Sequence, residues 1–318
     1  MTNFYYVPAP GKSLALYRDW LVMLICRPFF KRVILHWHAA GLAKWLETSV
    51  QIRSRAITYR LFKPVDLSIV LSKYNVADAE KLLSRRISVV PNGIANPCLD
   101  FAETVLPRRR ARFAARVKLL RDGHHAADTI QFVNVLFLAH CSREKGLFAA
   151  MEGVAAANHL MATGGAALRF KLVVAGGFVN AEEKTEFEHR LKTPEFAGMI
   201  DYLGFISGEE KERVLREADL FCFPTRYLGE NQPVNLIEAM AFGLPIVTTR
   251  WRSLPEMLPA GYCGLVATQS AAEIANALLA LLTSENGENL RENFLNRYTI
   301  EQHLAGMAEA FRSVESTP

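Results

Sequence analysis

The sequence is poor in cysteine, and its few cysteines form no recognisable pattern. It contains five among 318 residues, scattered singly and with no C-x-x-C arrangement. An odd number at wide spacing favours neither a disulfide framework nor a zinc site. We therefore expect reduced thiols and a cytoplasmic protein. The five are Cys26, Cys98, Cys141, Cys222 and Cys263.

Long apolar runs, internal repeats and low-complexity tracts are also missing. The most apolar run, residues 20–26, has only seven residues between Asp19 and Arg27. A membrane-spanning helix needs roughly 20, so we expect none. The chain is 50% hydrophobic and 22% charged, which is typical of a globular protein, and its length suits one large or two ordinary domains.

Charge is distributed unevenly along the chain. Residues 1–121 contain 21 Lys and Arg against 7 Asp and Glu, a net charge of +14. The remainder contains 16 against 25, a net charge of −9, which gives +5 for the whole chain. Such a basic half suits nucleic acid, an anionic membrane or an anionic substrate, and charge alone does not choose among them.

Apolar and basic side chains are interleaved over residues 17–32. Aromatic and aliphatic residues, Tyr17 and Phe29 among them, alternate here with cations. This pattern is typical of a helix on an anionic lipid surface, and a buried helix flanked by ordinary cations is the alternative. Because the sequence shows no nucleic-acid-binding motif, we expect a membrane surface and no nucleic acid as a partner. The cations are Arg18, Arg27, Lys31 and Arg32.

Strand-like apolar runs alternate with helical segments along most of the chain, which predicts an α/β fold with doubly wound parallel sheets. The basic stretch over residues 98–128 interrupts the alternation. It predicts a helical connector and a domain boundary near residues 123–129. The expected strands cover residues 32–38, 66–72, 86–92, 132–140, 170–178, 199–205, 219–224, 245–249 and 264–267.

The segment Gly229–Val247 carries the most informative functional pattern. Glu230 and Glu238 stand eight positions apart around a helix that we expect to begin at Pro233. The apolar residues of this helix fall on one face, which leaves Glu238 off the buried side. The N-terminus of this helix offers free backbone N–H groups and a partial positive charge to an anionic ligand. It lies at Asn231, Gln232 and Pro233.

This segment resembles the donor-site motif of the retaining family 4 glycosyltransferases, which belong to the family called glycosyl transferases group 1. Five further motifs occur in the order found in that family, and the similarity runs from about Ser68 to Val266. They are VVPNGI at 89–94, SREKG at 142–146, VVAGG at 173–177, YLGFIS at 202–207 and EADLF at 217–221.

The resemblance implies the GT-B fold, in which two Rossmann-like domains face each other across a cleft. Residues 1–125 would form the acceptor-side domain, and residues 126–299 the donor-binding domain. A helix over about 300–318 would pack back on the first domain. Family members usually carry further β–α units before the strand that holds the histidine, so this domain is expected to be incomplete.

The activity implied is transfer of a sugar from a nucleotide-sugar donor to an acceptor hydroxyl, with retention at the anomeric carbon. We expect no metal and no other cofactor. The acceptor would be a glycan or a lipid-linked molecule of cell-envelope or exopolysaccharide synthesis, reached from the cytoplasmic side of the membrane. A nucleotide-sugar 2-epimerase and a non-catalytic donor-binding subunit that needs a partner chain are the alternatives.

The resemblance also assigns roles to single residues. Glu230 would contact hydroxyls of the transferred sugar and Glu238 the ribose of the nucleotide. Lys145 would face the diphosphate, and Arg143 would assist it because His140 stands where the family usually has arginine. His38 would lie near the reacting carbon.

Other residues complete the predicted site. Gly176 and Gly177 would let the donor approach the backbone, because glycine has no Cβ. Gly204 and Phe205 would meet the nucleobase. His36 and His38 lie on the same side of a strand, a spacing that suits a metal, but with no third ligand in view we read His36 as structural.

Overall fold

The structure is a computed structural model of the chain. The five cysteines are all free thiols, as expected. The description that follows covers residues 3–8, 11–122, 130–267, 269–284 and 287–315.

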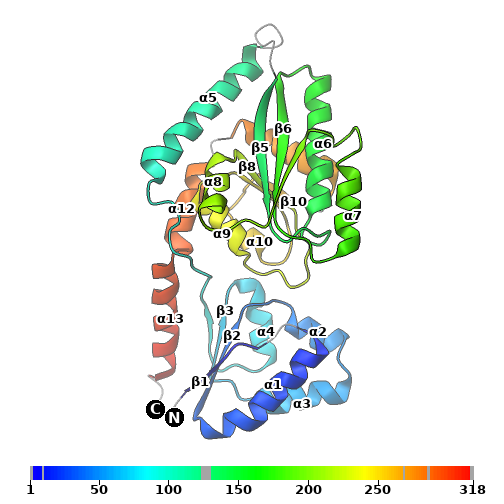
Figure 1. The fold of residues 1–318 in the computed structure, drawn as a ribbon. Coiled ribbons are helices and arrows are strands. Elements are labelled where there is room, and N and C mark those ends of the chain that lie inside the picture. Colours follow the sequence, from blue (N-terminus) through cyan, green and yellow to red (C-terminus); the bar gives the residue numbers. More distant parts are fainter. Residues whose placement is uncertain (1–2, 9–10, 123–129, 268, 285–286, 316–318) are drawn as a thin grey trace. The chain divides into compact units, whose positions relative to one another are not determined.

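By its contacts the chain divides into two compact units, each built around a parallel sheet (Figure 1). This confirms the α/β class. The first unit comprises Met1–Ile94, Leu228–Pro233 and Arg297–Pro318, and the second comprises Ala95–Tyr227 and Val234–Asn296.

The sheet of the first unit has four parallel strands in the order β1-β2-β3-β4. Its strands are β1 (Asn3–Tyr6), β2 (Arg32–Trp37), β3 (Leu67–Val70) and β4 (Ile87–Val89). Its helices are α1 (Ser13–Cys26), α2 (Leu42–Thr48), α3 (Ile52–Phe62), α4 (Val76–Lys81) and α13 (Ile300–Glu315), with 3-10 turns η1 (Arg27–Phe29) and η2 (Lys73–Asn75).

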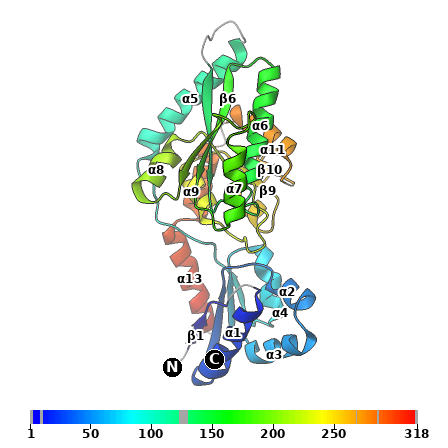
Figure 2. The same ribbon diagram turned by 45° about the vertical axis from the view of Figure 1, so that its right-hand side comes forward.

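Helices cover both faces of this sheet, which is why its strands are apolar on both sides. On β2, Val33 and Leu35 pack in a core with residues of α1, α2 and α3. Ile34 points to the opposite face, where Ala310 and Val314 of α13 cover it. The helix expected over residues 300–318 is therefore α13, which packs on the first sheet (Figure 2).

The sheet of the second unit has six parallel strands in the order β10-β9-β8-β5-β6-β7. Counted from its own first strand, this is the 3-2-1-4-5-6 order of the dinucleotide-binding doubly wound fold. The strands are β5 (Gln131–Leu138), β6 (Leu168–Ala175), β7 (Ile200–Gly204), β8 (Leu220–Phe223), β9 (Ile246–Thr249) and β10 (Leu265–Val266).

Helices flank the second sheet on both faces, with α6 and α7 on one side and α8 and α9 on the other (Figures 1 and 2). Right-handed crossovers produce this arrangement, because the strand order runs outward in two directions from β5 and β8. The helices are a π-helical turn η3 (Phe101–Val105), α5 (Leu106–Asp122), α6 (Leu147–Thr163), α7 (Ala181–Arg190), α8 (Gly208–Glu217), α9 (Val234–Ala241), α10 (Leu254–Met257), α11 (Ala271–Leu282) and α12 (Gly287–Arg297).

The basic connector is the helix α5, and it groups with the second unit. Arg109 donates to the carbonyl of Ala218 (2.8 Å) and Arg112 to that of Glu217 (2.9 Å). Arg116 donates to the Asp219 carboxylate (2.7 Å). The contacts thus divide the chain after Ile94, earlier than the sequence suggested. The boundary expected at residues 123–129 lies outside the described residues.

One strand was not anticipated. β1 pairs in parallel with β2, from Asn3 opposite Arg32 to Tyr6 opposite Leu35. Its four residues carry no alternating pattern long enough to recognise. The expected first sheet began at about Arg32, so this edge strand was not predicted.

Candidate functional site

The strand order of the second sheet reverses between β5 and β8. In doubly wound sheets, ligands bind beyond the carboxyl ends of the strands at this reversal, because the two connecting chains diverge there and leave a crevice. The loop that leaves β5 spans residues 139–146, and the loop that leaves β8 begins at residue 224.

Lys145 lies at the end of the first of these loops. Gly146 follows it with a φ of +90° and caps the N-terminus of α6, and a Cβ there would lie 2.3 Å from the carbonyl oxygen of Pro224. Only glycine allows the loop to pack this closely on the residue after β8. The Lys145 ammonium lies 4.4 Å from the ring centroid of Tyr227. The Lys145 ammonium is thereby held near the point where the strand order reverses.

Arg143 is oriented differently. Its Nη2 lies 2.6 Å from a carboxylate oxygen of Glu186 on α7, and its guanidinium stacks 4.6 Å from the ring centroid of Phe148. Lys145 and Arg143 were predicted to face the diphosphate together, but the Arg143 side chain is directed to α7 instead. His140, at the start of the loop, is exposed.

The two glycines after β6 differ in their surroundings. A Cβ on Gly176 would lie 1.8 Å from the carbonyl oxygen of Ala139, so this glycine is required for packing between the loops of β5 and β6. A Cβ on Gly177 would meet nothing within 4 Å. Space is therefore open beside Gly177 but not beside Gly176.

The end of β7 lies next to these glycines. The backbone N–H of Gly176 donates to the carbonyl of Gly204 (2.7 Å), and Gly204 has a φ of +70°. This left-handed turn exposes the following side chain, Phe205, which is 78% exposed. An exposed aromatic ring at this edge of the sheet offers a flat surface for stacking.

Glu238 lies on α9, whose first turn is fixed to the reversal point because the Asn235 side chain donates to the carbonyl of Leu138 (2.7 Å). The helix begins at Val234, one residue later than predicted. Glu238 lies off the apolar face, as expected, and its carboxylate accepts from Lys211 of α8 (2.6 Å). Its side chain is only 15% exposed.

In the first unit, the carboxyl ends of three strands hold the segment Leu228–Pro233. The Gln232 side chain donates to the carbonyl of Leu71, after β3 (2.6 Å), and accepts from the N–H of Asn92, after β4 (2.9 Å). The Asn231 amide donates to the carbonyl of His38, after β2 (3.3 Å). Asn231 and Gln232, predicted to bind the donor through the N-terminus of the helix, thus use their side chains to anchor their own segment.

The remaining predicted residues of this segment are also buried. Glu230 is 6% exposed, and Pro233, three residues further along the chain, is also buried. A carboxylate is costly to bury unless polar or charged groups accompany it. Glu230 is therefore held in place by the anchored segment rather than mobile at the surface.

His38 follows β2 and belongs to a group of three histidines. The rings of His36 and His38 lie 4.3 Å apart, which confirms that they share a side of the strand, and His303 of α13 lies 6.4 Å from His36. Burial first, and then His38 and His303, lower the pKa of His36 to about 4. Partial burial and His303 also lower the pKa of His38.

Three residues of the site, His303, Lys211 and Asn235, were not predicted from the sequence. Each is separated from its partner by a long stretch of chain, and no local pattern indicates such a pair. Among the described residues, no cluster of three or more His, Cys, Asp or Glu is arranged to hold a metal. In the same part of the chain, no helix combines the length and apolar character needed to cross a bilayer.

Comparison with curated proteins identifies relatives in polysaccharide synthesis. The chain is 31% identical over 283 residues to the putative colanic acid biosynthesis glycosyltransferase WcaL of Salmonella typhimurium, covering 83% of this chain and 65% of that protein. It is 29% identical over 195 residues to the amylovoran biosynthesis glycosyltransferase AmsK of Erwinia amylovora, covering 58% of this chain and 44% of that protein. The chain thus spans less than two thirds of the length of both relatives.

Among solved structures, Alr3699/HepE of Anabaena in complex with UDP superposes with a TM-score of 0.69 at 16% identity, covering 98% of this chain and 79% of that one. Such a likeness establishes the fold, which is GT-B. The family model described as glycosyl transferases group 1 matches residues 132–299, more than half of the chain. The chain therefore belongs to the glycosyl transferases group 1 family.

Proposed function

We propose that this protein is a retaining glycosyltransferase of family 4, which transfers a sugar from a nucleotide-sugar to an acceptor hydroxyl without a metal ion. One observation carries the proposal. The loops and helix that bear Lys145, Gly177, Gly204 and Glu238 meet the carboxyl-end edge of a doubly wound sheet, where this architecture binds nucleotides. The neighbour HepE, of the same fold, has been solved with UDP and with UDP-glucose.

The ribose is assigned to Glu238. A carboxylate accepts two hydrogen bonds from a vicinal diol, and such charge-assisted bonds are roughly twice as strong as neutral ones. Lys211 holds one carboxylate oxygen, Oε1 (2.6 Å), and orients the second toward a ligand. Its charge also offsets the repulsion between this carboxylate and a nearby diphosphate.

The diphosphate is assigned to Lys145 and to the N-terminus of α6, which follows it. At roughly 4 Å and an effective dielectric near 20, one cation attracts a unit negative charge by about 4 kcal/mol before desolvation. Gly177 allows the donor to approach the backbone, and Phe205 stacks on the base. Arg143 also binds the diphosphate, by releasing the Glu186 carboxylate and contacting a phosphate oxygen instead.

The sugar is assigned to Glu230 and His38. Glu230 accepts hydrogen bonds from sugar hydroxyls, and the neutral His38 imidazole lies beside the anomeric carbon. The bond from this carbon to the leaving phosphate breaks as the acceptor oxygen bonds to the same face. The acceptor proton passes to the leaving phosphate, so neither glutamate acts as a nucleophile.

We further propose a glycan or lipid-linked acceptor of exopolysaccharide synthesis, met at the cytoplasmic face of a membrane. The names of WcaL and AmsK support the pathway class. The free thiols favour a reducing compartment. On α1, the side chains of Leu14, Leu21 and Leu24 are 59 to 84% exposed and recur at helical spacing, as on a helix that contacts lipid.

The test is thermal stabilisation by UDP-, GDP- and ADP-sugars in the presence of a metal chelator. One nucleotide class should raise Tm by several degrees, because a ligand at 100 times its Kd adds about 2.7 kcal/mol. Glu238→Ala should weaken donor binding by about tenfold or more through loss of a charge-assisted contact. Lys211→Met should do so to a smaller extent, and Glu292→Ala, an exposed glutamate of α12, should leave the shift unchanged.

Turnover is then measured with lipid-linked and free glycan acceptors, and the anomeric configuration of the product is read by NMR. An inverted product would contradict retention, and a requirement for a divalent ion would contradict metal independence. Donor binding without transfer to any acceptor would favour the donor-binding subunit. No stabilisation of the folded protein by any nucleotide-sugar would overturn the assignment.

A further inference from the structure

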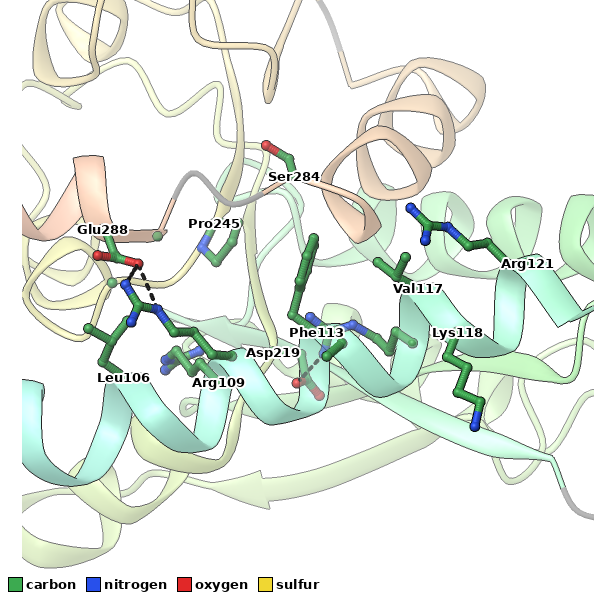
Figure 3. Close-up of a pocket in the computed structure, with 15 residues that line it drawn as sticks. Leu106, Arg109, Phe113, Val117, Lys118, Arg121, Asp219, Pro245, Ser284 and Glu288 are labelled. Atoms are coloured by element: carbon green, nitrogen blue, oxygen red, sulfur yellow. Dashed lines mark hydrogen bonds and ion pairs between the residues drawn. The ribbon is translucent and has the colours of Figure 1, made fainter.

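A cavity of about 580 Å³ lies against α5 in the second unit (Figure 3). Small-molecule sites commonly occupy about 300 to 1,000 Å³. The basic motif that forms one wall, residues 106–121, has no part in the donor site. The cavity therefore raises the question of a second ligand.

This cavity lies at the opposite end of the sheet from the donor site. Asp219, which lines it, precedes β8, and Pro245 precedes β9. Both therefore mark the amino ends of their strands. Because β8 has four residues, each rising about 3.3 Å, the two ends of the sheet are separated by roughly 13 Å. A molecule bound here would not occupy the place of the donor.

One part of the lining is apolar. Figure 3 shows Phe113 and Val117 projecting from α5 toward the side of the cavity that holds Pro245 and Ser284. Contact with these groups would remove hydrocarbon from water, which favours binding of an apolar chain. The apolar lining residues are Leu106, Phe113, Ala114, Val117 and Pro245.

The other part of the lining is cationic. Five lining residues are Arg or Lys, and two are Asp or Glu. Both carboxylates have cationic partners, since Glu288 accepts from Arg110 and Asp219 accepts from Arg116, each at 2.7 Å. An excess of three positive charges remains. The cations beyond those two pairs are Arg109, Lys118 and Arg121.

Arg109 shows most clearly that this charge is incompletely satisfied. Its Nη atoms donate to the carbonyls of Ala218 (2.8 Å) and Leu215 (3.0 Å), which are neutral acceptors. The Nε atoms of Arg109 and Arg116 are buried and have no hydrogen-bond partner within the described part of the chain. Burial lowers the pKa of Arg109 to about 9. The positive charge of Arg109 therefore adds to that of the exposed cations of the lining, Lys118 and Arg121.

We propose that this cavity binds an amphiphilic anion, a single hydrocarbon chain that ends in a phosphate. Its chain would contact Phe113 and Val117, and its phosphate would meet the guanidinium group of Arg121, about one turn beyond Val117 on α5. Guanidinium matches phosphate geometry in a bidentate manner. An excess of three positive charges favours a phosphate monoester, of charge about −1.5 to −2, over a carboxylate.

The proposal is tested by calorimetric titration of the full chain with dodecyl phosphate below its micelle concentration. We expect one molecule to bind per chain, and inorganic phosphate and dodecanol each to bind at least about tenfold more weakly, because each lacks one half of the contacts. Ala114→Trp should abolish binding by filling the cavity. Arg121→Glu should weaken it by about tenfold or more, whereas Arg108→Glu, on the same helix but outside the lining, should not.

Several results would overturn the proposal. Full affinity in Ala114→Trp would place the ligand elsewhere. Equal affinity for inorganic phosphate would reduce the site to a simple anion site. Loss of binding in Leu21→Glu/Leu24→Glu would assign the ligand to the apolar face of α1 instead. Absence of binding to the folded wild type would refute it outright, and none of these results bears on donor binding.

Discussion

His36 shows how a single buried side chain couples stability to pH. Its Nδ1 lies 2.5 Å from the Tyr5 hydroxyl, whereas its Nε2 is buried and has no hydrogen-bond partner among the described residues. The two histidines that face it, His38 and His303, also disfavour a positive charge. The folded protein therefore keeps His36 neutral down to a pH near 4, whereas an unfolded chain protonates it at about 6.5.

We predict that stability falls as the pH is lowered from about 6.5 toward 4. In this window the unfolded state binds a proton that the folded state refuses, so protonation favours unfolding. The His36 contribution is of the order of 2 kcal/mol at pH 5. Thermal unfolding at pH 7.5 and pH 5 should show a smaller loss for His36→Gln than for the wild type. His159→Gln, which removes an exposed histidine of α6, should behave as wild type, and equal losses in all three proteins would contradict the prediction.

At this scale, the position of Glu238 could be predicted but its partner could not. The 3.6-residue period places Glu238 off the apolar face of its helix, and the structure confirms this. Lys211 is 27 residues away, on a different helix. Such a contact arises from how α8 and α9 pack, and a local sequence pattern contains no information about it. His303 joins His36 for the same kind of reason.

At the scale of elements, the segment Leu228–Pro233 is notable because polar side chains fix it to a sheet. Gln232 is 6% exposed, donates to the carbonyl of Leu71 and accepts from the N–H of Asn92. Both backbone groups follow strands of the first unit. Without the glutamine side chain they would be buried without partners, which costs about 1 to 3 kcal/mol for each.

Replacement of Gln232 by Ala should therefore lower Tm by at least about 4 °C, since 1 kcal/mol shifts Tm by about 2 to 4 °C in chains of this size class. Differential scanning calorimetry measures the shift. Gln302→Ala, an exposed glutamine of α13, is the matched control and should change Tm by less than about 1 °C. An unchanged Tm in Gln232→Ala would mean that water replaces the lost contacts and that the segment is not fixed in this way.

Most elements could be predicted from their period, and the exceptions were short. The runs at residues 32–38 and 170–178 are long, apolar and bounded by turn residues, so β2 and β6 were predicted. β1 has four residues at an edge and depends on pairing with β2, which no local pattern reveals. The start of α9 differed by one residue because Pro233 is compatible with the first helical position and with the position before it.

For the whole molecule, the sequence indicated two units but not the division between them. Sequence places α5 between the two sheets, and its basic character suggested a connector. Its arginines instead bind the end of α8 and Asp219, so its contacts assign it to the second unit. Membership of a unit depends on which distant groups a helix meets, and this is decided only in three dimensions.

Charge and exposed apolar area coincide in the first part of the chain. Residues 1–94, the main part of the first unit, contain 14 Lys and Arg against 5 Asp and Glu, a net charge of +9. The exposed leucines of α1 at positions 14, 21 and 24 lie on one stripe, while Leu16 and Met23 on the other side are buried in the core. A folded helix with a second, unburied apolar face beside many cations fits an anionic bilayer, where each cation contributes about 1 kcal/mol.

We predict that the protein cosediments with phosphatidylglycerol vesicles at low salt and is largely released at about 0.5 M NaCl, where charges more than a few ångströms apart are screened. Leu21→Glu/Leu24→Glu should reduce binding at low salt by at least about tenfold, because it places two carboxylates in the contact face. Leu99→Glu alters an even more exposed leucine, in the second unit, and should have little effect. Equal binding by the α1 variant would leave charge as the sole cause, and absence of binding at low salt would remove the membrane from the proposed function.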